Sequence, residues 1–313
     1  MSNVEARPAE VTCTSTPGDV EVLGPRDVPL GGPRAMRVRR TLPQKQRSLI
    51  GAWCFCDHYG PDEVRMDVAP HPHTGLQTVS WLFTGEIEHR DSLGSHALVR
   101  PGELNLMTGG RGICHSEVST DTSAVLHGVQ LWLALPDAHR DAPRNFQHHV
   151  PPTVTLNGAD IRVFLGSLAG STSPVPTFSP LLGAEIVLPA GAALTLDADP
   201  SFEHGVLLDT GDVTLGETAL QPGDLGYVGT GRTSLALSSA NGARVVLLGG
   251  EPFGEEIVMW WNFVGRTHDE IAAYREEWQA ESDRFGRVDG YPGSRLPAPA
   301  LPGGRLRPRG NPA

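Results

Sequence analysis

The apolar residues of this chain occur in short runs that are separated by glycine and proline. Typical runs, at residues 49–55, 78–83 and 125–133, are rich in β-branched and aromatic types. Runs of this length and composition predict strands, because globular helices need about 10 or more residues. The 37 glycines and 27 prolines supply turns between them. We therefore predict an all-β protein.

One segment near the C-terminus has helical signals. Thr267 and Glu270 have the spacing of a capping box, in which two side chains satisfy the exposed amides of a first helical turn. Ile271, Tyr274 and Trp278 follow at a spacing that places them on one helical face. This predicts a single short helix that packs on a sheet and is followed by an extended tail rich in Pro, Gly and Arg.

Two turn motifs occur twice in the same order, which indicates an internal repeat. Thr-Gly-Glu-Ile and Arg-Pro-Gly-Glu in the first half are matched by Thr-Gly-Asp-Val and Gln-Pro-Gly-Asp in the second, at offsets of 126 and 121 residues. The repeat predicts the same small barrel built twice. We predict a disordered N-terminal segment at residues 1–19 and a first, metal-binding barrel at 20–150. A second barrel without metal ligands is predicted at 151–265, and the helix with its tail at 266–313. The polar segment 137–152 is predicted to be the linker.

Charge and composition exclude several classes of protein. The chain has 25 Lys and Arg against 36 Asp and Glu, a net charge of −11, which argues against nucleic-acid binding because that needs a basic surface. No run of about 18 apolar residues predicts a membrane span. The N-terminus lacks the apolar stretch of a secretory signal, so we expect a cytoplasmic protein. The four cysteines are then expected to be reduced, buried thiols: Cys13, Cys54, Cys56 and Cys114.

Two pairs of potential metal ligands lie in the first half of the chain. His71 and His73 precede a predicted strand, and His115 and Glu117 follow the two glycine turns that fold a second strand back beside the first. Residues i and i+2 of an extended chain point to the same face, so both pairs can reach one ion. Three imidazoles and a carboxylate suit a divalent transition metal: imidazole suits Fe, Ni, Cu or Zn, and the carboxylate keeps the site hard enough for Fe(II) or Mn, with Co also possible.

Glu117 has two possible roles. Its spacing from His115 favours metal ligation, and a carboxylate that leaves the metal could serve as a general base for a bound substrate. The second half of the chain has no such set, because the repeat offsets place Asp197, Asp199, Ala236 and Ser238 at the equivalent positions. One metal is therefore expected.

The remaining histidines have no matching partner and are expected at the surface or in hydrogen-bonded core positions. His89, in the charged segment 86–91, is expected at a solvated rim. This group comprises His58, His89, His96, His127, His139, His148, His149, His204 and His268.

The motifs together resemble the pirin family of bicupins. The resemblance rests on His71-Pro-His-Thr-Gly-Leu-Gln-Thr-Val, the glycine turns, and Met107-Thr-Gly-Gly-Arg-Gly-Ile-Cys-His-Ser-Glu117, and it covers about residues 20–300. It implies two cupin barrels packed face to face, with one metal, usually iron, on His71, His73, His115 and Glu117. Gln77 stands where many relatives carry Glu, which would weaken or redirect activity if that position tunes the pocket.

Two functions follow from the resemblance. The first is a dioxygenase that opens flavonols such as quercetin with O₂, with Glu117 removing the hydroxyl proton of a flat phenolic substrate. Phe55, Leu106, Met107 and Trp132 are candidates for an apolar slot that holds this substrate. The second is a metal- and redox-sensitive regulatory protein that binds a metabolic enzyme or a transcription factor without turnover. The enzyme hypothesis predicts turnover without any partner protein, whereas the regulatory hypothesis predicts bound metal and no turnover.

Overall fold

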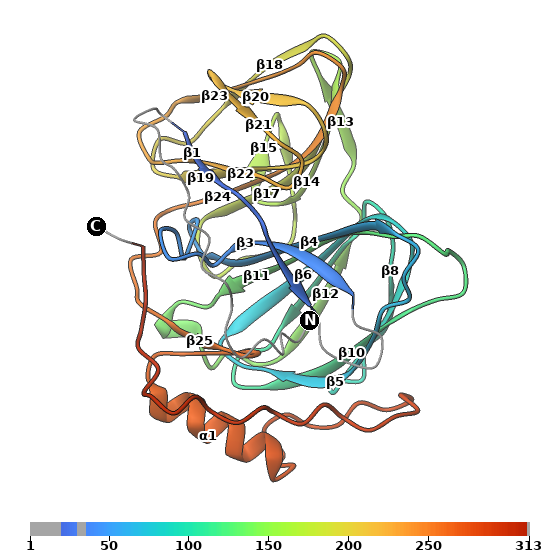
Figure 1. Ribbon diagram of the computed structural model, residues 1–313, viewed down its shortest axis with the longest axis vertical. Helices are drawn as coiled ribbons and strands as arrows, with labels where there is room; N and C mark the ends of the chain where they lie inside the picture. Colours follow the sequence, from blue (N-terminus) through green and yellow to red (C-terminus); the bar gives the residue numbers. More distant parts are fainter. Residues whose placement is uncertain (1–19, 30–35, 312–313) are drawn as a thin grey trace.

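A computed structural model of the chain describes residues 20–29 and 36–311. The predicted disordered segment 1–19, and Cys13 with it, lies outside these residues. Figure 1 shows two β barrels stacked on each other, with a helix and an extended C-terminal segment along the far side of the first barrel. The prediction of an all-β chain with one short helix is confirmed.

The first barrel consists of two antiparallel sheets. The sheet that faces the second barrel has the order β12-β9-β6-β11-β4-β3-β2, and the outer sheet has the order β5-β10-β7-β8. The inner sheet comprises β2 (Arg26–Pro29), β3 (Arg37–Leu42), β4 (Trp53–Asp62), β6 (Leu76–Thr84), β9 (Leu104–Thr108), β11 (Leu126–Ala134) and β12 (Asn145–His149). The outer sheet comprises β5 (Asp67–His73), β7 (Ile87–Asp91), β8 (His96–Val99) and β10 (Ile113–Ser119).

The second barrel repeats this arrangement. Its inner sheet has the order β1-β22-β19-β24-β17-β14-β13, and its outer sheet the order β18-β23-β20-β21. The inner sheet comprises β1 (Glu21–Leu23), β13 (Thr153–Leu156), β14 (Ala159–Leu165), β17 (Leu181–Leu188), β19 (Glu203–Gly211), β22 (Leu225–Val228) and β24 (Ala243–Gly250). The outer sheet comprises β18 (Ala192–Asp197), β20 (Val213–Leu215), β21 (Thr218–Leu220) and β23 (Ser234–Ser239), and a small hairpin joins β15 (Ser167–Leu168) to β16 (Ser171–Thr172).

The repeated glycine turns occupy equivalent places in the two barrels. Gly85 lies between β6 and β7, and Gly211 ends β19 just before β20. Both have a positive φ, 95° and 86°, and a Cβ at either would lie within 2.7 Å of a backbone carbonyl oxygen. Only glycine fits such a turn without strain. The turns at Gly85 and Gly211 therefore mark the point where each chain half crosses from its inner to its outer sheet.

One apolar cluster lies between the two barrels. Side chains of both inner sheets form a single buried cluster, in which Trp53 and Trp81 of the first barrel contact Phe164 of the second. Trp53 donates its indole N–H to the carbonyl oxygens of Leu182 and Gly249, at 3.1 Å each. Continuous apolar packing of this kind stabilises the barrels as one body.

Two strands close the edges of the inner sheets. The predicted linker 137–152 contains a 3₁₀ turn, η1 (Asp137–His139), and strand β12, which pairs with β9 at the edge of the first inner sheet. The segment predicted as the linker thus contains a strand of the first barrel, because edge pairing compensates for its polar sequence. At the equivalent edge of the second barrel, β1 pairs with β22, although β1 lies in the first part of the chain.

The C-terminal segment returns to the first barrel. The hairpin of β25 (Val258–Trp260) and β26 (Phe263–Gly265) leads into α1 (His268–Gln279). The predicted cap is present: Thr267 Oγ1 accepts the Glu270 N–H, and Glu270 Oε2 accepts the Arg266 N–H. Ile271 and Trp278 are buried against the apolar residues of this segment and of β10. Among the described residues no helix is long and apolar enough to cross a membrane.

The described cysteines are buried and free. Burial raises the pKa of Cys54 and of Cys56 to about 12, and that of Cys114 to about 11. Such thiols remain protonated and unreactive near neutral pH. The expectation that these three thiols are buried is confirmed.

Candidate metal centre

Strand β10 is the central element of the candidate site. It pairs with β5 on one side, where His115 lies opposite His71, and with β7 on the other, where Glu117 lies opposite His89. A β-bulge follows His115 on the β5 side. Because side chains of paired residues stand on the same face of a sheet, the three strands carry their polar side chains into one place inside the barrel.

The three predicted histidine ligands lie together. Ligand atoms of His71, His73 and His115 are all within 4.8 Å of one another. Nε2 of His73 lies 3.1 Å from Nε2 of His115, and the His71 and His115 ring centroids are 4.3 Å apart. None of the three side chains is more than 1% exposed. The structure therefore brings together three of the four residues predicted as ligands.

The Nδ1 atoms of two of these rings face backbone carbonyls. His71 Nδ1 lies 2.9 Å from the Ala69 oxygen, and His73 Nδ1 lies 3.2 Å from the Asn262 oxygen. A carbonyl oxygen can only accept, so each ring carries its proton on Nδ1. Each Nε2 is then left with a free lone pair, which is the form that binds a metal.

Burial keeps these rings neutral. Desolvation lowers the pKa of His71, His73 and His115 well below the ordinary value of 6.5, and neighbouring histidines lower it further. Neutral imidazole is the ligand form, so the site does not have to lose protons to bind an ion near neutral pH.

The donor set fits a divalent transition metal. Two ligand nitrogens at right angles on such an ion lie about 3 Å apart, which matches the His73 and His115 separation. Among the described residues, neither His71 Nε2 nor Glu117 Oε2 has a hydrogen-bond partner, although both atoms are buried. Buried polar atoms without partners are rare, and a cation would satisfy both.

Glu117 lies beside the histidine cluster. It is 1% exposed, and its ligand oxygen is within 4.8 Å of ligand atoms of His115 and His89. Its Oε1 lies 3.1 Å from Ser80 Oγ, which also lies 3.0 Å from Gln130 Oε1. The serine hydroxyl can donate its one proton to either oxygen. Glu117 therefore has one oxygen that is held by β6 and one that faces the interior.

The prediction that His89 lies at a solvated rim is wrong. It is 3% exposed and belongs to the cluster, with its ring centroid 5.1 Å from that of His115 and stacked on Phe146 of β12 at 4.7 Å. The charged segment around it suggested a solvated rim, but alternation along β7 turns His89 and Asp91 inward together. The i, i+2 spacing of these two residues was the signal that could have identified them.

The four residues predicted to form the apolar slot do not all lie beside the histidine cluster. Phe55 and Trp132 stack with centroids 4.0 Å apart, and Trp132 lies 5.2 Å from the His73 ring. Leu106 instead belongs to the core between the barrels, so its inclusion was wrong. Met107 is the neighbour of Leu106 on β9 and is also buried. Phe55 and Trp132 remain as apolar neighbours of the site.

Gln77 does not share the face of β6 that contacts Glu117. Its amide donates to Thr108 Oγ1 at 2.9 Å, across the pair of β6 with β9. Ser80, which contacts Glu117, is three positions away and therefore has the opposite orientation in a regular strand. An effect of Gln77 on activity through direct contact with Glu117 is not supported by this placement.

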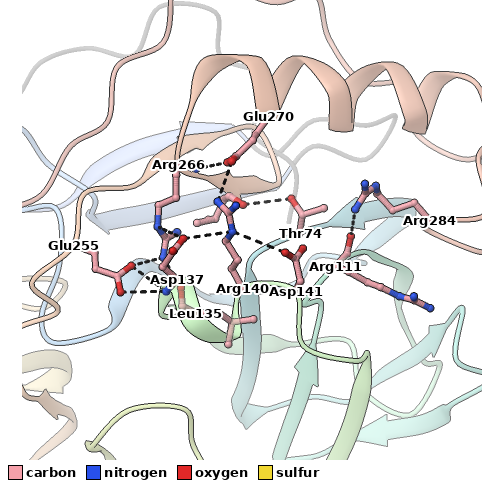
Figure 2. Close-up of polar contacts among 11 residues, drawn as sticks. Thr74, Arg111, Leu135, Asp137, Arg140, Asp141, Glu255, Arg266, Glu270 and Arg284 are labelled. Carbon is pink, nitrogen blue, oxygen red and sulfur yellow. Dashed lines mark hydrogen bonds and ion pairs between the residues drawn. The ribbon is translucent and has the colours of Figure 1, made fainter.

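The C-terminal segment covers the site from one side and is anchored by ion pairs. The turn between β25 and β26 supplies the Asn262 carbonyl to His73. Figure 2 shows how this segment is held: Arg266 contacts Glu255 and the Leu135 carbonyl, and Arg140 contacts Glu270. The ion pairs join the start of α1 to the 3₁₀ turn after β11. The fixed position of Asn262 therefore depends on contacts between distant parts of the chain.

A second histidine cluster lies between the barrels. His58 of β4 and His127 of β11 each place Nε2 2.6 Å from Oδ1 of Asp209 on β19. Arg244 donates to Oδ2 of the same carboxylate, and Arg39 lies 3.5 Å from His58 Nε2. Two guanidinium groups at this place oppose binding of a cation. We interpret the cluster as a hydrogen-bonded connection between the barrels, as expected for His58 and His127 in the core.

The geometry of Asp209 explains its ionisation. Burial alone would raise its pKa, but hydrogen bonds from His127 and His58 outweigh burial and hold the pKa well below its usual range. Burial lowers the pKa of His58. The connection is thus a carboxylate held by two imidazoles and one guanidinium.

Comparison with known proteins identifies the family. Residues 35–133 match the family model Pirin, and residues 183–286 match the model of the Pirin C-terminal cupin domain. A Pseudomonas aeruginosa protein named "Putative quercetin 2,3-dioxygenase" is 45% identical over 282 residues, which cover 88% of this chain and 89% of that protein. The chain belongs to the pirin family. A pirin-like protein of Caulobacter vibrioides is 34% identical and covers 80% of this chain and 91% of its own length.

Solved structures agree with this assignment. The crystal structure of a quercetin 2,3-dioxygenase from Acinetobacter baumannii has a TM-score of 0.88 and 38% identity, covering 92% of this chain and 97% of that one. The predicted fold, two cupin barrels packed face to face with a short C-terminal helix, is confirmed. The two family models match one domain in each half of the chain.

The neutral histidines predict a pH dependence of stability in the metal-free pirin. Each ring takes up a proton near pH 6.5 when unfolded but stays neutral when folded, so the unfolded state binds more protons below that pH. The free energy of unfolding should therefore fall as pH falls. Replacing His71 by Gln removes one such group and should reduce this fall by up to about 1.4 kcal/mol per pH unit below about pH 6.5.

Urea denaturation of both metal-free proteins at several pH values checks this prediction. The stability of the wild type should fall more steeply with decreasing pH than that of the variant, because only the wild type keeps the third buried histidine. Parallel curves would show that His71 titrates alike in the folded and unfolded chains.

Proposed function

We propose that this pirin is a metal-dependent dioxygenase that opens flavonols such as quercetin with O₂. Its single mononuclear site would be formed by His71, His73, His115 and Glu117. The observation that carries the proposal is the convergence of three neutral, buried imidazoles with a buried carboxylate, in which two ligand atoms have no partner among the described residues. The 45% identical relative and the 38% identical solved structure, whose names refer to quercetin 2,3-dioxygenase, support the choice of substrate.

The metal proposed first is Fe(II), with Mn, Ni, Cu, Zn or Co as alternatives. Imidazole nitrogens suit the later transition metals, whereas the carboxylate keeps the set suitable for Fe(II) and Mn(II). When bound, the ion would supply a Lewis acid that orients the flavonol oxygens and O₂.

The side chains around the cluster have separate tasks in this proposal. Glu117, once it has left the metal, would accept the hydroxyl proton of the flavonol on Oε2, while Ser80 holds Oε1 and so fixes the orientation of the carboxylate. Trp132 and Phe55 provide an apolar wall beside His73 for a flat ring. Each of these groups comes from a strand of the rigid barrel, which keeps the arrangement constant during turnover.

Anaerobic reconstitution with Fe(II) tests the proposal. O₂ uptake and loss of flavonol absorbance are then measured after adding quercetin, with His115→Ala as the control variant. Uptake in the wild type and its loss in the variant are expected, because His115 is shared by both groups of ligand atoms in the site. Stoichiometric iron without O₂ uptake would refute the dioxygenase.

A second candidate function is supported by the enclosure of the site. The four side chains are at most 1% exposed, so a flavonol can reach them only if the covering residues move. A regulatory pirin, which reports the state of its metal to an enzyme or a transcription factor, needs no such route. Bound iron without turnover, together with a partner affinity that changes with the oxidation state, would favour this second function.

A further inference from the structure

His115 differs from the other two histidines in what its Nδ1 atom contacts. His71 and His73 face backbone carbonyls, whereas His115 Nδ1 lies 3.3 Å from Nδ1 of His89. On its other side, His89 places Nε2 3.2 Å from Oδ2 of Asp91. A chain of contacts thus runs from a buried carboxylate through two imidazoles to the metal position.

The carboxylate decides where the protons of this chain lie. Asp91 Oδ2 can only accept, so an imidazole at His89 that has one ring proton carries it on Nε2. His89 Nδ1 is then an acceptor, which requires the proton of His115 to be on Nδ1. The Nε2 atom of His115 is consequently free of a proton on the side that faces His73.

The members of the chain are held in place by separate contacts. Asp91 Oδ1 accepts the N–H groups of Leu93 and Ser95, which fixes its carboxylate at the turn after β7. The ring of His89 stacks on Phe146 with an interplanar angle of 26°. Asp91 and His89 are 2% and 3% exposed, so water does not compete for these hydrogen bonds. The chain can therefore transmit one orientation to His115.

We propose that His89 and Asp91 are positioning residues of the metal centre, which set the proton position and orientation of His115 through a carboxylate–imidazole–imidazole chain. This inference rests on the proposed function, since it assumes that His115 binds the metal through Nε2. Outer partners of metal-bound histidines generally fix their proton position and raise their basicity. His115 takes its partner from a side chain, so a substitution can remove it, whereas the carbonyl partners of His71 and His73 cannot be removed in this way.

Asp91→Asn is the sharpest variant. Asparagine keeps the shape of Asp91 and an oxygen that accepts the Leu93 and Ser95 N–H groups, but its amide nitrogen would donate to His89 Nε2. Both imidazoles would then carry their protons on the opposite nitrogens, and His115 Nε2 would no longer be free. His89→Ala removes the hydrogen-bonded link between Asp91 and His115 altogether.

The dissociation constant for Fe(II), measured anaerobically by competition with a chelator, should rise about 10- to 100-fold in both variants. Zinc-loaded protein provides the second measurement, in which NMR of the histidine ring nitrogens locates each proton. His115 should be protonated on Nδ1 and His89 on Nε2 in the wild type. His96→Ala, which replaces an exposed histidine on β8, should leave both measurements unchanged.

Several results would overturn this inference, and they differ from those that refute the dioxygenase. Wild-type affinity in Asp91→Asn and His89→Ala, or NMR evidence that His89 itself binds zinc, would remove the positioning role and leave the proposed function intact. Weakened affinity in the variants, in a wild type that binds iron without O₂ uptake, would support the positioning role and refute the dioxygenase. A wild type that binds no metal would overturn both.

Discussion

Replacing Glu117 by Gln is expected to reduce the rate of quercetin opening per bound iron by about 100- to 10,000-fold, the usual contribution of a general base. The amide has the shape of the carboxylate and can still accept from Ser80 Oγ, so the barrel should fold normally. It cannot take up the flavonol proton. O₂ consumption by the Fe(II)-reconstituted variant, divided by its measured iron content, checks this prediction.

Dividing by iron content separates the two roles of Glu117. If Glu117 were only a metal ligand and not a base, Glu117→Gln would bind less iron, but its rate per bound iron would stay near that of the wild type. Glu103→Gln is a suitable matched control, because Glu103 is a partly exposed carboxylate that lies 3.6 Å from His148 and outside the cluster. Its activity should equal that of the wild type. A fully active, iron-loaded Glu117→Gln protein would contradict the catalytic role.

Replacing Asp209 by Ala is expected to lower the free energy of unfolding by about 3–5 kcal/mol, the usual cost of removing one partner from a buried ionic group. The substitution leaves Arg244 without this carboxylate and the Nε2 atoms of His58 and His127 without their acceptor. Urea denaturation near neutral pH, followed by tryptophan fluorescence, measures the loss.

Asp209→Asn should cost less, about 1–3 kcal/mol, because the amide oxygen still accepts one of the imidazole N–H groups. Asp197→Asn, at an exposed position on β18 of the same barrel, should remain within about 0.5 kcal/mol of the wild type. Wild-type stability in Asp209→Ala would show that the connection between the barrels does not contribute to folding. Such a result would leave the metal centre unaffected, since Asp209 is not a member of it.

The internal repeat and the candidate ligands could be predicted from the sequence for the same physical reason. Alternation along a strand puts residues i and i+2 on one face, so His71 with His73, and His115 with Glu117, form pairs without any knowledge of the fold. Glycines such as Gly85 and Gly211 occupy turns whose backbone requires a positive φ. Periodicity and turn chemistry are local properties, and they were enough to predict two barrels and a cluster in the first.

The position of strand β12 depended on distant contacts. Its polar sequence has no strand signal, and the strand forms because the free edge of β9 pairs with it. Local propensity could not reveal that β9, about 40 positions earlier in the chain, leaves a free sheet edge for β12 to pair with.

The partners of the predicted residues were decided only by the tertiary structure. Asp209 meets His58 and His127 because two inner sheets pack face to face, and no spacing in the sequence relates β19 to β4 or β11. His89 becomes a partner of His115 because β7 pairs with β10 in one particular register. A shift of one residue would turn the His89 side chain to the opposite face of the sheet. Alternation therefore determined which residues share a face, whereas strand pairing and barrel packing determined which of them meet.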